Sequence, residues 1–180
     1  MRNWIALFRG INVMGCNSLP MKELAALLQR EGLDDVRTYI QSGNALFRSP
    51  IGSAHALANR IGRAVYNAKG FHPKVMVLSV KELERAASNN PFPKAEDEPQ
   101  TLHLFFLSEA PLCADLTSLG RLRRAREAFA LKGKIFYLHT PDGFAESKVG
   151  AHVERHIHVD ATARNWNTVR KLLEMANAVE

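Results

Sequence analysis

Residues 36–48, VRTYIQSGNALFR, decide the fold of this chain. Val36 to Ile40 and Ala45 to Arg48 carry the β-branched and aromatic residues of two short strands. Ser42-Gly43 lies between them, and glycine takes the positive φ that a tight hairpin turn demands. The stretch therefore predicts an antiparallel hairpin.

The hairpin is flanked on each side by a helix and then by a further strand. On the N-terminal side, Pro20 opens a helix whose apolar residues recur at helical spacing until Gly32. On the C-terminal side, Ser53 caps a helix that Gly70 closes. The strand before the first helix and the strand after the second helix are the apolar runs 4–8 and 74–78. Strand, helix, strand, strand, helix, strand is the order of a ferredoxin-like unit, in which the first strand is central and pairs beside the third.

The same order begins again after a change in composition. Ser79 and Glu82 predict a capped short helix, and prolines and charges crowd residues 91–100, which we interpret as a linker. Beyond it we expect a strand at 102–107, a helix at 114–119, a hairpin at 128–139, a helix at 147–156, a strand at 159–162 and a last helix from about Asn165 to Val179. The predicted fold class is α+β: two tandem ferredoxin-like (α-β plait) units with antiparallel sheets, at 1–90 and 101–180, and a C-terminal helix.

Composition narrows the class of protein. The 180 residues are 46% apolar and 23% charged, which is ordinary for a globular chain. The formal charge is +6, so anionic partners are favoured over cationic ones. The apolar run near the N-terminus ends at Arg9, and no stretch approaches the roughly 20 apolar residues that span a bilayer. With only Cys16 and Cys113, we expect reduced thiols, a cytoplasmic location and no membrane association.

Polar residues concentrate in three predicted loops: Arg9-Gly10-Ile11-Asn12 after the first strand, Gln41-Ser42-Gly43-Asn44 in the hairpin, and Arg164-Asn165-Trp166-Asn167 before the last helix. The end of the first strand and the start of the third lie near each other in this topology, which makes Arg9 and Asn44 neighbours. A helix N-terminus with a capping Asn and an Arg is suited to phosphate or carboxylate. We expect the ligand-binding residues to be Arg9, Asn12, Gln41, Ser42, Asn44, Lys148, Arg164, Asn165 and Asn167.

A structural interpretation of the same loops stays open. Glycines can adopt backbone conformations that other residues disfavour, asparagine side chains can form hydrogen bonds in turns and at helix caps, and arginines can form structural ion pairs. The chain has no GxGxxG or GxxxxGK[ST] pattern, so neither a dinucleotide enzyme nor a P-loop enzyme is supported. We predict no cofactor.

The strings ALFRGINVMGCNSLPMKEL, VRTYIQSGNALF, NNPFP, LHLFFL, TPDGF with Ser147-Lys148, and ATARNWNTVRKLLEM resemble the bacterial family known as domain of unknown function 1697. The resemblance implies a cytoplasmic protein of two α-β plaits and carries no established activity or catalytic residue. Met14 and Cys16 stand where members usually carry a glycine and a basic residue. The catalytic residues therefore remain unknown, and enzymatic activity stays open.

Two further patterns bear on catalysis and metals. His152 and His156 share a helix face, but no HExxH or cysteine partner accompanies them, so we expect a solvated face and no metal site. Ser42 does not lie in the GxSxG motif that is typical of a hydrolase nucleophile.

The alternative function is a nucleic-acid-binding module that uses the basic cluster Arg121, Arg123, Arg124 and Arg126. The predicted sheet aromatics lack the pattern of RNA-recognition domains, so we expect them in the core. The leading hypothesis remains an anionic or nucleotide-like ligand, such as a phosphate-containing small molecule. A third alternative is a structural plait that forms a homodimer through an open sheet edge or face.

Overall fold

A computed structural model describes residues 1–13 and 15–178, and Met14 and the predicted end of the last helix at Val179 lie outside them. The described chain forms two compact units: unit 1 comprises 1–85 with the described C-terminal residues from Leu172, and unit 2 comprises 86–171. The linker predicted at 91–100 falls inside unit 2, where it forms the short 3-10 helix η1 (Pro93–Asp97). Asn90 Nδ2 donates to Glu96 Oε1 at 2.7 Å, and Ala95 is buried, so this segment is ordered by its own contacts.

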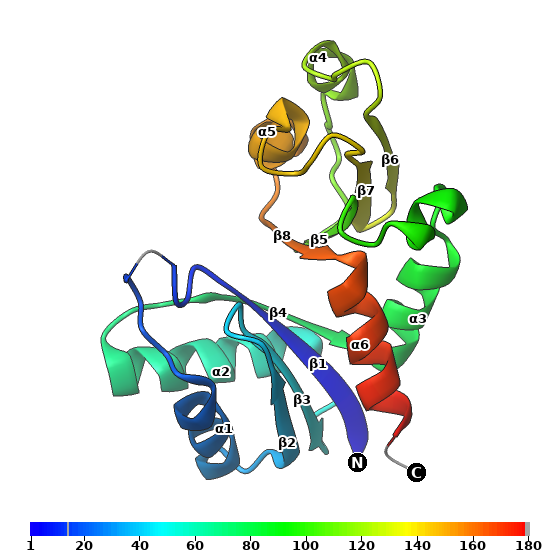
Figure 1. The fold of residues 1–180 in the computed structure, drawn as a ribbon. Helices are drawn as coiled ribbons and strands as arrows, with labels where there is room; N and C mark the ends of the chain where they lie inside the picture. Colours follow the sequence, from blue (N-terminus) through cyan, green and yellow to red (C-terminus); the bar gives the residue numbers. More distant parts are fainter. Residues whose placement is uncertain (14, 179–180) are drawn as a thin grey trace. The chain divides into compact units, whose positions relative to one another are not determined.

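Unit 1 contains the predicted order of strands and helices (Figure 1). Its elements are β1 (Arg2–Arg9), α1 (Met21–Arg30), β2 (Asp34–Tyr39), β3 (Asn44–Ser49), α2 (Ala54–Lys69), β4 (Lys74–Ser79) and the start of α3 (Val80–Ser88). The sheet order is β2-β3-β1-β4, and each neighbouring pair is antiparallel. Because β1 lies between β3 and β4, the predicted central position of the first strand is confirmed.

The helices of unit 1 begin and end where the sequence predicted. Ser53 Oγ accepts a hydrogen bond from the Ala56 amide, and Gly70 closes α2 with a φ of 77°. Ser79 and Glu82 form the expected capping box: the Ser79 amide and hydroxyl both donate to the Glu82 carboxylate at 2.7 Å.

The two faces of the first sheet bury different side chains. Figure 1 shows α1 and α2 on one face, and alternation along β1 sends Trp4, Ala6 and Phe8 into the core beneath them. Asn3, Ile5, Leu7 and Arg9 therefore point to the other face, where Ile5 and Leu7 are fully buried.

Unit 2 repeats the topology with the sheet order β6-β7-β5-β8. Its elements are β5 (Leu102–Leu107), α4 (Leu116–Arg121), β6 (Ala128–Lys132), β7 (Ile135–His139), α5 (Lys148–Ile157), β8 (Ala161–Asn165) and the start of α6 (Trp166–Asn177). Helices α4 and α5 contact each other, and their apolar residues share a core with Phe105, Phe136 and Leu138. The predicted aromatic core is thus present, and the fold is the predicted pair of α-β plaits.

The last strand is the main correction to the predicted elements. We expected a strand at 159–162 and a loop at Arg164-Asn165, whereas β8 runs from Ala161 to Asn165 and α6 begins at once with Trp166. The reason is cross-strand pairing: Arg164 lies opposite Leu104, and Asn165 lies opposite His103. The described residues contain no helix long and apolar enough to cross a membrane.

Candidate functional site

The RGIN and QSGN loops of unit 1 are adjacent. Leu7 pairs with Asn44 across β1 and β3, and the Phe8 amide donates to the Gly43 carbonyl at 2.9 Å. The predicted proximity of the two loops is therefore observed. Arg9, at the end of β1, is half-buried and lies opposite Lys74 of β4.

Gly43 allows the close approach of these loops. Its φ is 85°, and a Cβ atom at this position would lie 2.5 Å from Ile11 Cδ1 and 2.8 Å from Phe8 Cβ. A residue with a side chain would meet both the strain of left-handed backbone and a steric clash. The glycine is thus explained by packing.

Asn12 joins the loops through its side chain. Its Nδ2 donates to the Leu19 and Gln41 carbonyls, both at 2.9 Å, and its Oδ1 accepts from the Leu19 amide at 2.7 Å. Both donor hydrogens of the amide are therefore used by backbone acceptors. Asn12 therefore links the two loops through its hydrogen bonds.

Asn44 is also held by the fold. It is fully buried, and its Nδ2 donates to the Tyr39 carbonyl at 3.0 Å and to Ser42 Oγ at 3.4 Å. Gln41 and Ser42 are exposed at the tip. The preceding residue, Ile40, is 46% exposed and adopts a φ of 47°, an outlier for a β-branched side chain.

The remaining predicted ligand residues belong to unit 2. Arg164 is only 7% exposed, and its Nη1 donates to Thr162 Oγ1 at 2.9 Å and to the Ala163 carbonyl at 2.8 Å. Burial lowers the pKa of Arg164 to about 10, which leaves it protonated at neutral pH. Asn165 Oδ1 accepts from the Thr168 amide at 3.0 Å, so Asn165 caps α6 as predicted.

Lys148 and Asn167 are exposed, each near the start of its helix. The α5 terminus beside Lys148 is capped by Ser147, whose Oγ accepts from the Gly150 amide. The structure thus brings together the first two loops within unit 1 and groups Arg164, Asn165 and Asn167 within unit 2.

The basic cluster of the alternative function begins at Arg121, the last residue of α4, and continues after the helix. All four arginines are exposed, but Arg124 Nη2 lies 3.3 Å from Glu146 Oε2 and Arg126 Nη1 lies 2.6 Å from Asp142 Oδ1. Within unit 2, these two ion pairs connect the segment after α4 with the segment after β7. Arg121 and Arg123 form no ion pair with any described residue.

The histidines of α5 do not assemble a metal site. His152 Nδ1 lies 2.8 Å from the Lys148 carbonyl oxygen, and Glu154 Oε1 accepts from the Ala161 amide at 2.7 Å. Across residues 1–13 and 15–178, no three His, Cys, Asp or Glu side chains gather in a way that could hold a metal ion.

A surface hollow of unit 1 was not predicted. It consists of two adjoining depressions that share Asn3, Val80 and Ala176. The smaller one, of about 10 Å³, has room for one water molecule, and the larger one measures about 720 Å³. We call the combined feature the basic hollow, and its principal residues are Arg2, Asn3, Arg37, Leu46, Val80, Lys81 and Ala176.

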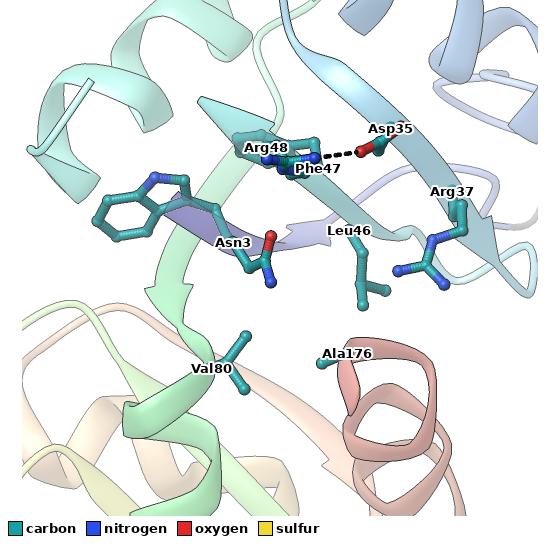
Figure 2. Close-up of a pocket in the computed structure, with 9 residues that line it drawn as sticks. Asn3, Asp35, Arg37, Leu46, Phe47, Arg48, Val80 and Ala176 are labelled. Carbon is teal, nitrogen blue, oxygen red and sulfur yellow. Dashed lines mark hydrogen bonds and ion pairs between the residues drawn. The ribbon is translucent and has the colours of Figure 1, made fainter. Parts of the chain in front are cut away.

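Two sides of the basic hollow differ in character. Figure 2 shows Asn3, Arg37 and Leu46 extending from the strands, with Val80 and Ala176 across from them. Among the residues that the structure describes, four cationic residues line the two depressions, Arg2, Arg37, Arg48 and Lys81, and one carboxylate does so, that of Asp35. That carboxylate accepts from Arg48 Nη1 at 3.0 Å, drawn as the dashed line in Figure 2.

The other three cations are not paired in this way. Arg2, Arg37 and Lys81 form no ion pair with the residues that the structure describes. The Arg2 guanidinium leans toward Gly52, with Nη1 3.3 Å from the position that a Gly52 Cβ would take. Arg2 and Lys81 line the larger depression, and Arg37 lines the smaller one.

The sequence offers a partial signal for this hollow. Alternation along the strands places Asn3, Leu46 and Arg48 on one face, because Asn3 pairs with Arg48 and Leu46 pairs with Arg37. Nothing in the local pattern indicates that Val80 and Ala176, about 96 positions apart, would line the same depression.

Comparison with known proteins supports the fold and the family. The structure of a conserved bacterial protein, SP0830 from Streptococcus pneumoniae, is similar with a TM-score of 0.70 and 26% sequence identity, over 97% of this chain and 98% of that chain. No curated protein matches.

The family comparison matches residues 1–137, a range that contains the RGIN, QSGN, NNPFP and LHLFFL strings. The TPDGF and RNWN strings lie beyond it. Since the matched range covers more than half of the sequence, the chain belongs to the family described as protein of unknown function (DUF1697).

Proposed function

We propose that this protein binds a small anionic molecule in the basic hollow of unit 1. The observation that carries the proposal is the charge of the described lining: four cationic side chains line the hollow, and the one carboxylate among its described residues, that of Asp35, is bonded to Arg48. The larger depression, which Arg2 and Lys81 line, measures about 720 Å³ and lies within the roughly 300–1,000 Å³ of small-molecule sites, whereas Arg37 and Arg48 line the adjoining smaller one.

The chemistry of Arg37 and Lys81, one cation from each depression, fits such a ligand. The guanidinium of Arg37 presents parallel N–H donors that match a carboxylate or phosphate. Lys81 adds a compact charge on a flexible stem. The N-terminus of α3 itself offers little, because the Glu82 carboxylate already occupies its capping position at Ser79. The side chains, rather than the helix dipole, would hold the anion.

The predicted ligand patch at the RGIN, QSGN and RNWN loops stays a prediction. The geometry favours the basic hollow over these loops, because the Asn12 and Asn44 side chains donate to backbone carbonyls and Arg164 is buried.

Calorimetric titration with pyrophosphate tests the proposal. We expect Arg37→Gln and Lys81→Gln each to weaken binding at least fivefold, and Arg63→Gln, an exposed change on α2, to leave it unchanged. Weakening by Arg9→Gln alone would place the anion at the loops instead. Absence of binding, or equal losses in all variants, would refute a specific anion site.

Nucleic-acid binding by unit 2 is a second candidate, supported by the exposure of Arg121 and Arg123. It predicts retention of single-stranded RNA that weakens steeply with salt and is reduced by Arg121→Gln with Arg123→Gln. No retention at low salt would reject it.

The predicted homodimer is tested separately by light scattering at two protein concentrations.

A further inference from the structure

We infer that the ligand of the basic hollow is a hydroxyl-rich anion: a sugar or other polyol that carries one phosphate or carboxylate group. This inference rests on the proposed function and adds the chemical class of the ligand. It follows from the larger of the two depressions, in which uncharged amides accompany the cations.

The larger depression has more room than an anionic group alone would fill. It measures about 720 Å³, and sites of roughly 300–1,000 Å³ accommodate whole small molecules. A phosphate or carboxylate held by Arg2 or Lys81 would occupy a small part of this space. The ligand therefore has a body besides its charged group, and the rest of the lining decides the chemistry of that body.

The accessible part of the described lining is polar. Its exposed members are Arg2, Asn3, Lys81 and Asn177. Of the two apolar residues described in it, Val80 is half-buried and Ala176 is only 5% exposed. Because the hydrophobic gain scales with the apolar area removed from water, this lining offers little to an apolar body. The body that fits it is polar.

Two amides leave hydrogen-bonding groups available in this depression. Asn3 lies on β1, Asn177 is the last residue of α6, and neither side chain forms a hydrogen bond with any described residue. Figure 2 shows the Asn3 side chain extending from its strand, with Val80 across from it. The Ser79 hydroxyl, by contrast, donates to the Glu82 carboxylate at 2.7 Å and accepts from the Glu82 amide at 3.3 Å.

The amides select for hydroxyl groups on the ligand. A fully ionised phosphate can accept from the Nδ2 groups of Asn3 and Asn177, but it has no hydrogen to donate to their Oδ1 atoms. A hydroxyl group both donates and accepts, as an amide side chain does. A polyol that places its anionic group at Lys81 and its hydroxyls at the two amides therefore gives each of these groups a partner.

Three probes separate the charged group from the hydroxyls: inorganic phosphate, ribose 5-phosphate and ribose, each titrated calorimetrically into the full chain. We expect ribose 5-phosphate to bind at least tenfold more tightly than inorganic phosphate, and ribose to bind more weakly than ribose 5-phosphate by a similar factor. Lys81→Gln should weaken the binding of both phosphates at least fivefold, because it removes the charge that attracts their shared group.

Two truncations test the amides. Asn3→Ala and Asn177→Ala should each weaken ribose 5-phosphate at least threefold and leave inorganic phosphate unchanged. The second variant keeps the test decisive should the first disturb β1. Asn67→Ala, the same change at an exposed position of α2, should alter neither affinity.

The contrary outcomes separate this inference from the proposed function. Equal affinities for phosphate and ribose 5-phosphate, both reduced by Lys81→Gln, would overturn the hydroxyl-rich ligand and keep the anion site. Binding of ribose 5-phosphate that neither truncation weakens would overturn the role of the amides in the same way. Equal binding of ribose and ribose 5-phosphate that is insensitive to Lys81→Gln would overturn both proposals, as would no binding of any probe.

Discussion

Asn12 and Leu19 are joined by two hydrogen bonds. The Leu19 amide donates to Asn12 Oδ1 at 2.7 Å, and Asn12 Nδ2 donates to the Leu19 carbonyl at 2.9 Å. The same amide group also reaches the Gln41 carbonyl. One side chain thus closes the segment between β1 and α1 and attaches it to the β2–β3 turn.

Replacing Asn12 with alanine should therefore act on stability. Loss of three hydrogen bonds, at about 1 kcal/mol each, predicts a decrease of roughly 2–3 kcal/mol in the free energy of unfolding. Urea denaturation measures it, with Asn59→Ala on the exposed surface of α2 as the control. Unchanged stability together with lost ligand binding would instead favour the predicted role of Asn12 in a ligand site.

Gly43→Ala should destabilise unit 1 by about 2–4 kcal/mol, since it combines left-handed strain with overpacking against Ile11 and Phe8. Gly133→Ala is the matched control, because Gly133 also has a positive φ of 58° but has no atom within 4 Å of the added Cβ position. The control should lose only about 1–2 kcal/mol. Equal decreases in the free energy of unfolding, measured by urea denaturation, would show that overpacking against Ile11 and Phe8 does not destabilise Gly43→Ala.

Ile40→Asn should raise the free energy of unfolding by about 1 kcal/mol. Ile40 has a φ of 47° and a side chain that is nearly half exposed, whereas Asn adopts left-handed backbone at lower cost. Val13→Asn changes a similarly exposed residue that has no positive φ and should have little effect. A lower denaturation midpoint for Ile40→Asn would mean that its apolar contacts outweigh the backbone strain.

Protonation of His103 should destabilise unit 2 in acid. The ring stacks on Phe144 with centroids 3.8 Å apart, and burial lowers the pKa of His103 from 6.5 to about 4. The unfolded chain therefore binds more protons between these values, so stability is full above about pH 6.5 and declines toward pH 4. The shift corresponds to at most about 3 kcal/mol.

Denaturation midpoints measured between pH 4.5 and 7.5 check this expectation, with His103→Phe as the variant that keeps an aromatic ring against Phe144. The variant should show a shallower decline in acid. Some slope should persist, because burial also lowers the pKa of His139. Parallel pH profiles for the two proteins would exclude His103 as a source of acid sensitivity.

Local sequence signals predicted most of the first unit. The turn at Gly43, the caps at Ser53 and Ser79 and the C-cap at Gly70 depend on residues a few positions apart, so their physics is visible in the sequence. The site was less accessible to such reasoning. That Asn12 and Asn44 contact a ligand stays a prediction, and the local sequence did not indicate that their side-chain amides donate to backbone carbonyls.

The order of strands and helices, most of their caps and turns, and hence the two α-β plaits could be predicted from the sequence, whereas the bounds of β8 could not. The tertiary structure was needed to show that Arg164 is buried in a strand, that Arg124 and Arg126 form ion pairs with carboxylates, and that Arg37 and Lys81 line adjoining depressions. The physical reason is the separation along the chain of the residues that interact. Backbone conformation follows from neighbouring residues, whereas burial and ion pairing follow from which distant segments the sheets bring into contact.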